Sequence, residues 1–252
     1  MKSFNKDLLK VNVYSSRSEM GAAAAGDVKA AILRALENKD MINMIFAAAP
    51  SQNEVLANLA TDKEIPWGRV NAFHMDEYIG LDKNAPQGFG NFLRDHIFGI
   101  APFASVNYIR IDAPNADEEC ERYSALLRAN PVDIVVLGIG ENGHIAFNDP
   151  PFADFNDSKL VKSVKLDEVC RKQQVNDGCF AKIEDVPTHA LTLTVPALMS
   201  GKELYCIVPA KTKAAAVNAT LNGEITPECP ASVLRTHPHA ALYLDPDSAS
   251  LL

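Results

Sequence analysis

A glycine-rich segment that follows an apolar run carries residues suited to acid–base chemistry. After the run Asp133–Leu137 comes GIGENGHIAFNDPP, in which His144 and Asp149 stand beside three glycines. Histidine titrates near neutral pH, and a neighbouring carboxylate can orient its ring, so the two could exchange protons with a substrate hydroxyl. We therefore predict that His144 and Asp149 are catalytic, and that Gly138 and Gly140 let the backbone approach a ligand.

The same glycines also spell G-x-G-x-x-G, the pattern of a dinucleotide-binding loop. That loop must open a long helix, and an acidic residue must follow about 20 residues later. Here Pro150 and Pro151 follow closely and prevent a long helix. We therefore expect no nicotinamide cofactor.

A second acidic group ends another apolar run. Asp76 follows Arg69–Met75, where partial desolvation would make its carboxylate a better base. The position would equally suit a helix N-cap, with Glu77 in the first turn. His74 should point to the opposite face of the strand, which favours a place in the core.

Two further segments could bind an anion. Ser51 follows the sequence AAAP at the expected start of a helix, where backbone N–H groups and a hydroxyl can bind negative charge. Lys211 and Lys213 follow the run Glu203–Val208 and could contact a phosphate. Two exposed lysines are an equally good interpretation of that pair.

Short apolar runs alternate with amphipathic stretches, which predicts an α/β protein whose parallel strands are covered on both faces. The expected strands are Val11–Tyr14, Met41–Ala47, Arg69–Met75, Val106–Ile109, Asp133–Leu137, Ala190–Val195, Glu203–Val208 and Ala240–Leu244. The expected helices begin at Arg17, Ser51, Asn115 and Lys211, the first of them opened by the capping box SRSE and the last closed by Gly223.

This arrangement brings the candidate residues together, because open parallel sheets bind ligands beyond the carboxyl ends of their strands. We expect one domain over residues 1–252. The less regular segment 147–185 is either a lid or insertion over the site, or a plain surface excursion.

Composition excludes several classes of protein. The chain has 252 residues, of which 47% are hydrophobic, and a formal charge of −8, which argues against a nucleic-acid partner. We find no apolar stretch long enough for a signal peptide or membrane span, so we expect a soluble cytoplasmic protein. The five cysteines show no CxxC spacing and the histidines no ligand pattern, so we expect no disulfide framework and no metal.

Two long motifs resemble glucosamine-6-phosphate deaminases. FHMDEYIGL (residues 73–81) looks like their F-N-M-D-E-Y segment, and residues 138–150 resemble G-x-G-x-D-G-H-I-A-F-N-E-P. PTHALT (187–192) resembles a third segment. The resemblance implies a modified Rossmann-like three-layer sandwich with a mostly parallel sheet, and conversion of a hexosamine phosphate to a ketose phosphate and ammonia without a redox cofactor.

The resemblance also assigns roles. Asp76 matches the base that moves a proton between C1 and C2, and His144 matches the acid/base that opens the pyranose ring. Asp149 matches a glutamate that holds this histidine. Lys213 and Ser51 match residues that contact the substrate phosphate.

Three positions depart from the family pattern. Asn142, which we include among the catalytic residues, stands where the deaminases usually have an aspartate, and galactosamine-6-phosphate isomerases resemble this chain in their N-G-H segment. AAAPS (47–51) replaces a T-G-x-x-P phosphate loop. The family's phosphate-contacting arginine has no clear match near Val175–Phe180, where Arg171 or Lys172 could substitute.

Two alternatives remain open on the sequence. 6-Phosphogluconolactonases share the fold and a G-x-D-G-H-x-A-S-L-F segment, but residues 145–150 resemble the deaminase version instead. A non-catalytic sugar-phosphate sensor is the other alternative. The expected partner is a small hexosamine phosphate, and a homo-oligomer of the chain is left open.

Overall fold

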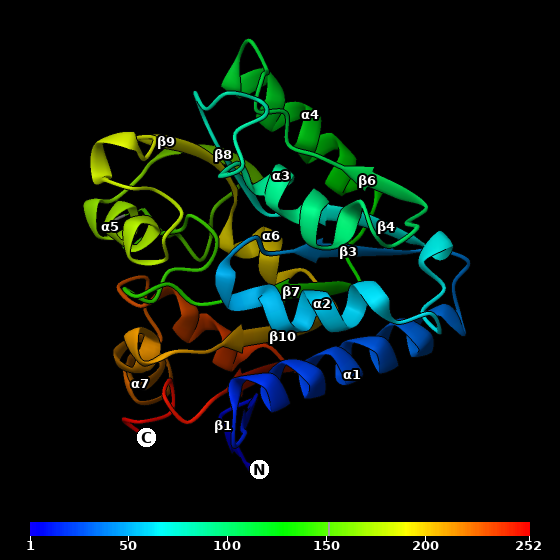
Figure 1. Cartoon of the computed structure of the whole chain (residues 1–252), viewed down its shortest axis with the longest axis vertical. Coiled ribbons are helices and arrows are strands. Elements are labelled where there is room, and N and C mark those ends of the chain that lie inside the picture. The colour runs from blue at the N-terminus through cyan, green and yellow to red at the C-terminus, as the bar shows by residue number, and fades with distance from the viewer. Residues whose placement is uncertain (151) are drawn as a thin grey trace.

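Eight strands form a central sheet in the computed structural model, which describes residues 1–150 and 152–252 (Figure 1). In spatial order they are β1 (Lys2–Lys6), β2 (Leu9–Val13), β11 (Ala240–Leu244), β10 (Glu203–Val208), β7 (Ile134–Leu137), β3 (Ile42–Phe46), β4 (Val70–His74) and β6 (Ser105–Asn107). β1 pairs antiparallel with β2, and the other neighbours run parallel. The predicted α/β class with a mostly parallel sheet is confirmed.

The side chains of the sheet alternate between two apolar layers. Met44 and Phe46 of β3 pack with α1 (Arg17–Leu36) and α2 (Asn53–Thr61) on one face. Ile45 points to the other face, which is covered by α4 (Ala116–Ala129), α6 (Val195–Met199) and α7 (Ala214–Asn222). The inner strands are largely apolar because both of their faces are buried.

The start of α1 illustrates a local difference from the expected capping box. Ser16 Oγ accepts a hydrogen bond from the backbone N–H of Glu19, at 3.1 Å, as expected. The Glu19 carboxylate, however, accepts the backbone N–H of Ser15, also at 3.1 Å, rather than that of Ser16. The second hydrogen bond of the capping box is therefore made to Ser15, one residue before the N-cap.

A second, antiparallel sheet of three strands stands beside the first. It is formed by β5 (Asp76–Tyr78), β9 (His189–Leu193) and β8 (Val161–Lys165), in that order. The expected strand at Ala190–Val195 therefore exists but does not belong to the large sheet. Met75 alone separates β4 from β5, so the chain passes directly from one sheet to the other.

The segment 147–185 contributes β8 and the helix α5 (Glu168–Asn176), apart from Pro151, which lies outside the described residues. In Figure 1, α5, β8 and β9 lie on the side toward which the arrows of β3 and β10 point. This places α5 near the carboxyl ends of the parallel strands. The short helix α3 (Phe89–Leu93) follows β5.

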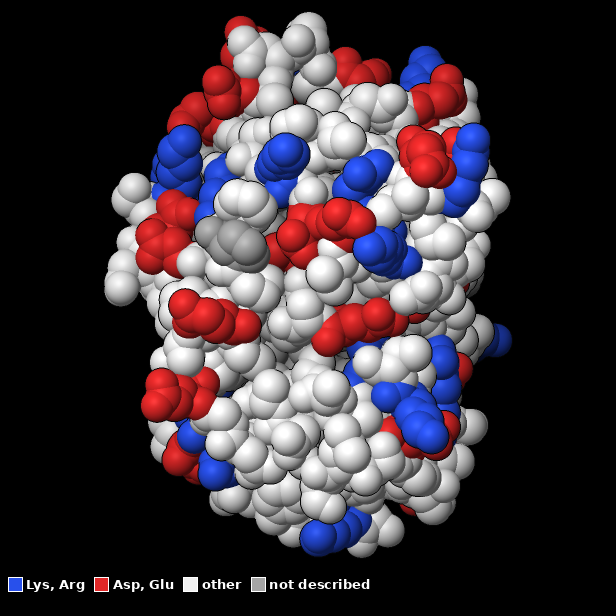
Figure 2. Space-filling model, turned by 90° about the vertical axis from the view of Figure 1, so that its left-hand side faces the viewer, with Lys and Arg blue, Asp and Glu red and all other residues white. Residues whose placement is uncertain are grey.

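Figure 2 shows the face of the molecule on that side. Acidic and basic side chains are intermingled there, with acidic groups across the middle of the face. This surface is unlike the continuous positive patch that a nucleic-acid backbone requires. Within the part of the chain that the structure describes, no helix has both the length and the apolar character needed to cross a membrane.

Candidate active site

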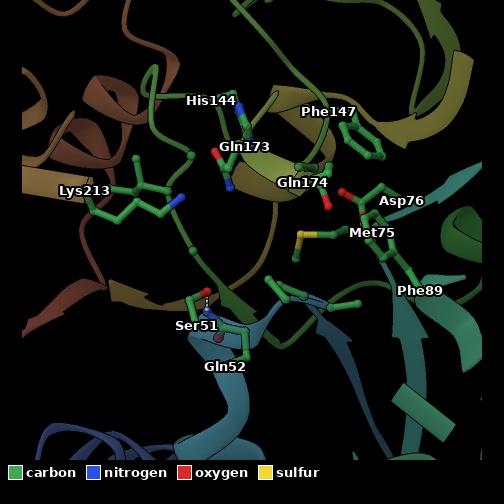
Figure 3. Close-up of a pocket in the computed structure, with 17 residues that line it drawn as sticks. Ser51, Gln52, Met75, Asp76, Phe89, His144, Phe147, Gln173, Gln174 and Lys213 are labelled. Atoms are coloured by element: carbon green, nitrogen blue, oxygen red, sulfur yellow. Dashed lines mark hydrogen bonds between the residues drawn. The ribbon is translucent and has the colours of Figure 1, made fainter. Parts of the chain in front are cut away.

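A pocket with a cavity volume of about 60 Å³ lies at the carboxyl ends of the parallel strands. Four loops contribute to it, following β3, β4, β7 and β10, as the sheet-edge rule predicts. The lining residues are Ala47, Ala48, Ala49, Ser51, Gln52, Met75, Asp76, Phe89, Gly138, Ile139, Gly140, His144, Ala146, Phe147, Gln173, Gln174 and Lys213 (Figure 3).

Asp76 is the first residue of β5, and it is buried among apolar side chains. It pairs with Thr192 across the small sheet, so it is not the helix N-cap that the sequence also allowed. Burial raises the pKa of Asp76 well above its usual value, and the negative charge of Glu77 makes a smaller contribution in the same direction. The Asp76 carboxylate is therefore a stronger proton acceptor than an exposed aspartate.

Glu77 holds the backbone next to the pocket. One carboxylate oxygen accepts the N–H groups of Tyr78 at 2.9 Å and Phe89 at 3.1 Å, and the other accepts that of Gly90 at 2.9 Å. These bonds fix the start of α3, which places the Phe89 ring against the pocket. Glu77 thus has a positioning role beside Asp76, and burial raises the pKa of its own carboxyl group against the effect of these hydrogen bonds.

His74 points away from the pocket, as expected. Its Nε2 accepts the backbone N–H of Ile109 at 2.8 Å, and burial lowers the pKa of the imidazole to about 4. His74 is therefore neutral at physiological pH and belongs to the core.

The imidazole of His144 is held by two oxygen acceptors. Its Nδ1 lies 2.8 Å from Asn142 Oδ1 and 3.0 Å from Asp149 Oδ1. Since both neighbours accept, Nδ1 carries the proton, and Nε2, which has no hydrogen bond to any described residue, is left with a lone pair. His144 lines the pocket, whereas Asn142 and Asp149 do not and act on its far side.

Asn142 links the other two members of this group. Its Nδ2 donates to Asp149 Oδ1 at 3.0 Å, and its Oδ1 also accepts the backbone N–H of His144 at 3.1 Å. Burial by itself would raise the pKa of Asp149, but the bonds from His144 and Asn142 outweigh it and the pKa is lowered. Asp149 therefore remains a carboxylate and stabilises a positive charge on the imidazole.

The predicted glycines line the pocket for reasons of packing. A Cβ atom at Gly140 would lie 2.1 to 2.3 Å from three atoms of the His144 ring, so a larger residue would displace the imidazole. A Cβ at Gly138 would lie 3.0 Å from Gln52 Nε2. Glycine is therefore required at these two positions to leave room for neighbouring side chains, as well as for a ligand to approach the backbone.

The polar groups suited to an anion lie across the pocket from Asp76 (Figure 3). Lys213 is 4% exposed, and burial lowers the pKa of its ammonium group. Among the described residues, no carboxylate lies within ion-pair distance of Lys213. Ser51 Oγ accepts from Gln52 Nε2 at 3.0 Å, so its own hydroxyl proton can be donated to a ligand.

Two glutamines of α5 line the pocket and were missed by the sequence analysis. Gln173 accepts the backbone N–H of Glu141 at 2.8 Å, which ties α5 to the glycine-rich loop, and Gln174 faces the pocket centre (Figure 3). No local sequence signal marks them, because they reach the pocket only through the packing of α5.

The basic residues suggested as substitutes for the family arginine lie elsewhere. Arg171 Nη2 donates to the carbonyl oxygens of Ile183 and Val186, at 2.7 and 2.9 Å, and Lys172 pairs with Glu168 on the surface. Neither lines the pocket, so both suggestions are wrong. Lys213 is the cationic side chain that the described residues bring to the pocket.

His144, Asp149 and Cys170 form a cluster whose potential ligand atoms all lie within 4.8 Å of one another. A metal ion would need a lone pair from each ligand atom, but His144 Nδ1 carries a proton that Asn142 Oδ1 accepts at 2.8 Å. His144 Nδ1 and Asp149 Oδ1 are also already joined at 3.0 Å. The arrangement fits a hydrogen-bonded cluster better than a metal site.

A polar pocket at the carboxyl ends of a parallel sheet is typical of α/β proteins that bind small molecules. Residues 15–243 match the family model described as glucosamine-6-phosphate isomerases/6-phosphogluconolactonase. The chain belongs to this family.

Similar proteins include two curated glucosamine-6-phosphate deaminases. One from Bacillus cereus is 36% identical over 86% of this chain and 80% of its own length. One from Listeria monocytogenes is 35% identical over 84% of this chain and 88% of its own length.

Solved structures agree with this assignment. The structure of a monomeric glucosamine-6-phosphate deaminase matches with a TM-score of 0.86 and 27% identity, covering 96% of this chain and 99% of the other. A 6-phosphogluconolactonase from Thermotoga maritima matches with a TM-score of 0.77 at 20% identity, over 93% of this chain and 98% of the other. The latter likeness concerns the fold alone.

Proposed function

We propose that the chain is an amino-sugar-phosphate deaminase/isomerase, which converts glucosamine 6-phosphate or a related hexosamine phosphate to a ketose 6-phosphate and ammonia. The observation that carries this proposal is that Asp76 and His144, which follow different strands, line one pocket with a buried lysine. The similarity to curated deaminases supports it.

His144 would open the sugar ring. Because Nδ1–H is engaged by Asn142 and Asp149, Nε2 can take the proton of the anomeric hydroxyl and pass a proton to the ring oxygen. The bond between C1 and the ring oxygen then breaks and gives the open-chain aldehyde. The Asp149 carboxylate stabilises the transient imidazolium.

Asp76 would then transfer the proton between carbons. Its carboxylate takes the proton from C2 while the aldehyde oxygen gains a proton, which gives an enolamine. The proton held by the carboxylate then goes to C1 and the amino group loses a proton, so that C2 and the nitrogen form an imine, which water hydrolyses to the ketose and ammonia. The raised pKa of Asp76 suits this step, because a more basic carboxylate accepts a proton from carbon more readily.

Lys213 and Ser51 would hold the phosphate at the opposite side of the pocket from Asp76. Binding energy from this remote group can then orient the reacting carbons. Asn142 would keep His144 in position through its amide, which requires no proton transfer at residue 142.

The proposal is tested by measuring ammonia and ketose phosphate released from glucosamine 6-phosphate and from galactosamine 6-phosphate. We expect turnover of at least one of them. 6-Phosphogluconolactone serves as the comparison substrate, and we expect its hydrolysis to remain at the rate of the enzyme-free blank. Absence of ammonia from both hexosamine phosphates would refute the assignment.

Replacing Lys213 with methionine is expected to lower kcat/KM by about 10- to 100-fold, because a charge-assisted hydrogen bond to phosphate contributes roughly 1.5–3 kcal/mol. Steady-state kinetics would measure the loss. Lys211→Met is the matched control, because Lys211 lies in the same turn, is exposed and does not line the pocket. Equal activity of the two variants would contradict the placement of the phosphate.

The pH profile of kcat/KM is expected to have its acid limb above the usual pH range of an aspartate. Asp76 must be ionised to accept a proton, and its raised pKa means that the carboxylate form is lost at a higher pH than in an exposed aspartate. Measurement of kcat/KM from about pH 4 to 9 would show this. A profile that stays flat down to pH 4 would rule out Asp76 as the group that titrates.

A further inference from the structure

Cys170 lies in the first half of α5 and is completely buried. Its Sγ lies within 4.8 Å of a carboxylate oxygen of Asp149 and of a ring nitrogen of His144. It forms no disulfide. A thiol at this place is therefore next to the group that holds the imidazole, on the side away from the pocket.

The Asp149 carboxylate has an unequal set of hydrogen bonds. Oδ1 is within 3.0 Å of both His144 Nδ1 and Asn142 Nδ2. Oδ2 is buried and has no hydrogen-bond partner among the described residues. A buried carboxylate oxygen without a donor is costly, so a neighbouring donor is expected to turn toward it.

We propose that Cys170 is a positioning residue whose thiol donates a hydrogen bond to Asp149 Oδ2 and thereby fixes the carboxylate that orients His144. A role for this contact in turnover rests on the proposed function of His144. The contact also couples α5, which carries Gln173 and Gln174 into the pocket, to the imidazole on the glycine-rich loop.

The electrostatic surroundings keep the thiol in its donor form. Burial raises the pKa of Cys170, and the charges of Asp149, Asp76 and Asp167 act in the same direction. The S–H group therefore stays protonated at neutral pH and can donate, whereas a thiolate could not.

Titration of the His144 ring by NMR tests the contact without relying on activity. His144→Gln identifies the resonances of His144 among the six histidines. Loss of a donor leaves the Asp149 carboxylate more basic, which favours the imidazolium form. We therefore expect Cys170→Ala to raise the titration midpoint of His144 by about 0.5 pH unit or more.

Serine replaces the thiol with another donor, so Cys170→Ser should return the midpoint toward that of the native protein. Cys206→Ala is the matched control for loss of a buried thiol, because Cys206 lies in the core of β10 outside the cluster. We expect Cys206→Ala to lower the stability of the protein and to leave the titration midpoint of His144 unchanged.

An unchanged midpoint in Cys170→Ala, or a midpoint in Cys170→Ser equal to that in Cys170→Ala, would overturn the proposal. The pH profile of kcat/KM should shift in the same order among these variants. If the native chain releases no ammonia while the NMR midpoint still shifts, the contact stands and the proposed function fails.

Discussion

Asp76→Asn is expected to lower kcat by about 10³-fold, within the range of roughly 10²–10⁴ for loss of a general base. The amide occupies the same volume but cannot take a proton from carbon. KM should change little, because the residues proposed to bind the phosphate lie across the pocket from Asp76. Ammonia release under substrate saturation measures the effect, and Asp247→Asn, an exposed and remote change of the same kind, is the control.

The same substitution should make the protein more stable at neutral pH. A carboxyl group whose pKa is raised on folding favours the folded state when protonated, and that contribution is lost as the pH rises through the folded-state pKa. Asparagine removes this penalty, so we expect Tm to rise by roughly 2–4 °C, which corresponds to about 1 kcal/mol in a chain of this size. The gain in Tm should vanish when the pH is below the pKa that an aspartate has in the unfolded chain.

Full activity in Asp76→Asn would remove Asp76 from the mechanism. Lower stability at neutral pH would show that the carboxylate is better compensated in the fold than its surroundings indicate. A gain in stability together with a loss of turnover is the combination expected of a buried carboxylate that acts as a general base.

Gly140→Ala is expected to lower kcat/KM by about 10²-fold, the loss typical of a catalytic group displaced by about 1 Å. The added methyl group would overlap the His144 ring, which must then move away from Asn142 and Asp149. Gly140 is not among the residues with positive φ, so alanine can adopt its backbone conformation. The effect should therefore arise from the displaced imidazole.

Gly26→Ala provides the matched control for this change. A Cβ at Gly26 meets no atom within 4 Å, and the residue lies on α1, where alanine is favoured over glycine by about 1 kcal/mol. Unchanged activity with a slightly higher Tm is expected there. If Gly140→Ala keeps most of its activity while remaining folded, the position of His144 does not limit the reaction.

The parts of the fold that the sequence predicted are those whose signal is local. Four strands of the large sheet are apolar runs buried on both faces, namely β3, β7, β10 and β11. Such a run can be identified as a strand from its own residues, without knowledge of the strands beside it. β8 was missed because VKSVK has only two apolar residues, which are separated by Lys162 and Ser163, and resembles a surface segment. β5 was missed because three residues beginning with Asp76 and Glu77 have no strand signal of their own.

The candidate site divides in the same way. Residues in the segments that follow the strands, such as Asp76, Ser51 and His144, could be predicted, because topology brings strand ends together. Gln174 and Cys170 could not, because they reach the site only through the packing of α5 against the rest of the molecule. The wrong suggestions of Arg171 and Lys172 have the same cause, since both point away from the pocket on that helix.

The passage of the chain at Met75 from the large sheet to the small one has a consequence for heat resistance. Asp76 is anchored through β5 to β9. The loop of His144 follows β7 of the other sheet, but it is also bonded to β9, because Phe147 N–H donates to Thr192 Oγ1 and Asn148 Nδ2 donates to a backbone carbonyl of that strand. Partial loosening of the three-stranded sheet would displace the reacting groups before the eight-stranded sheet melts. Thermal inactivation should therefore precede global denaturation.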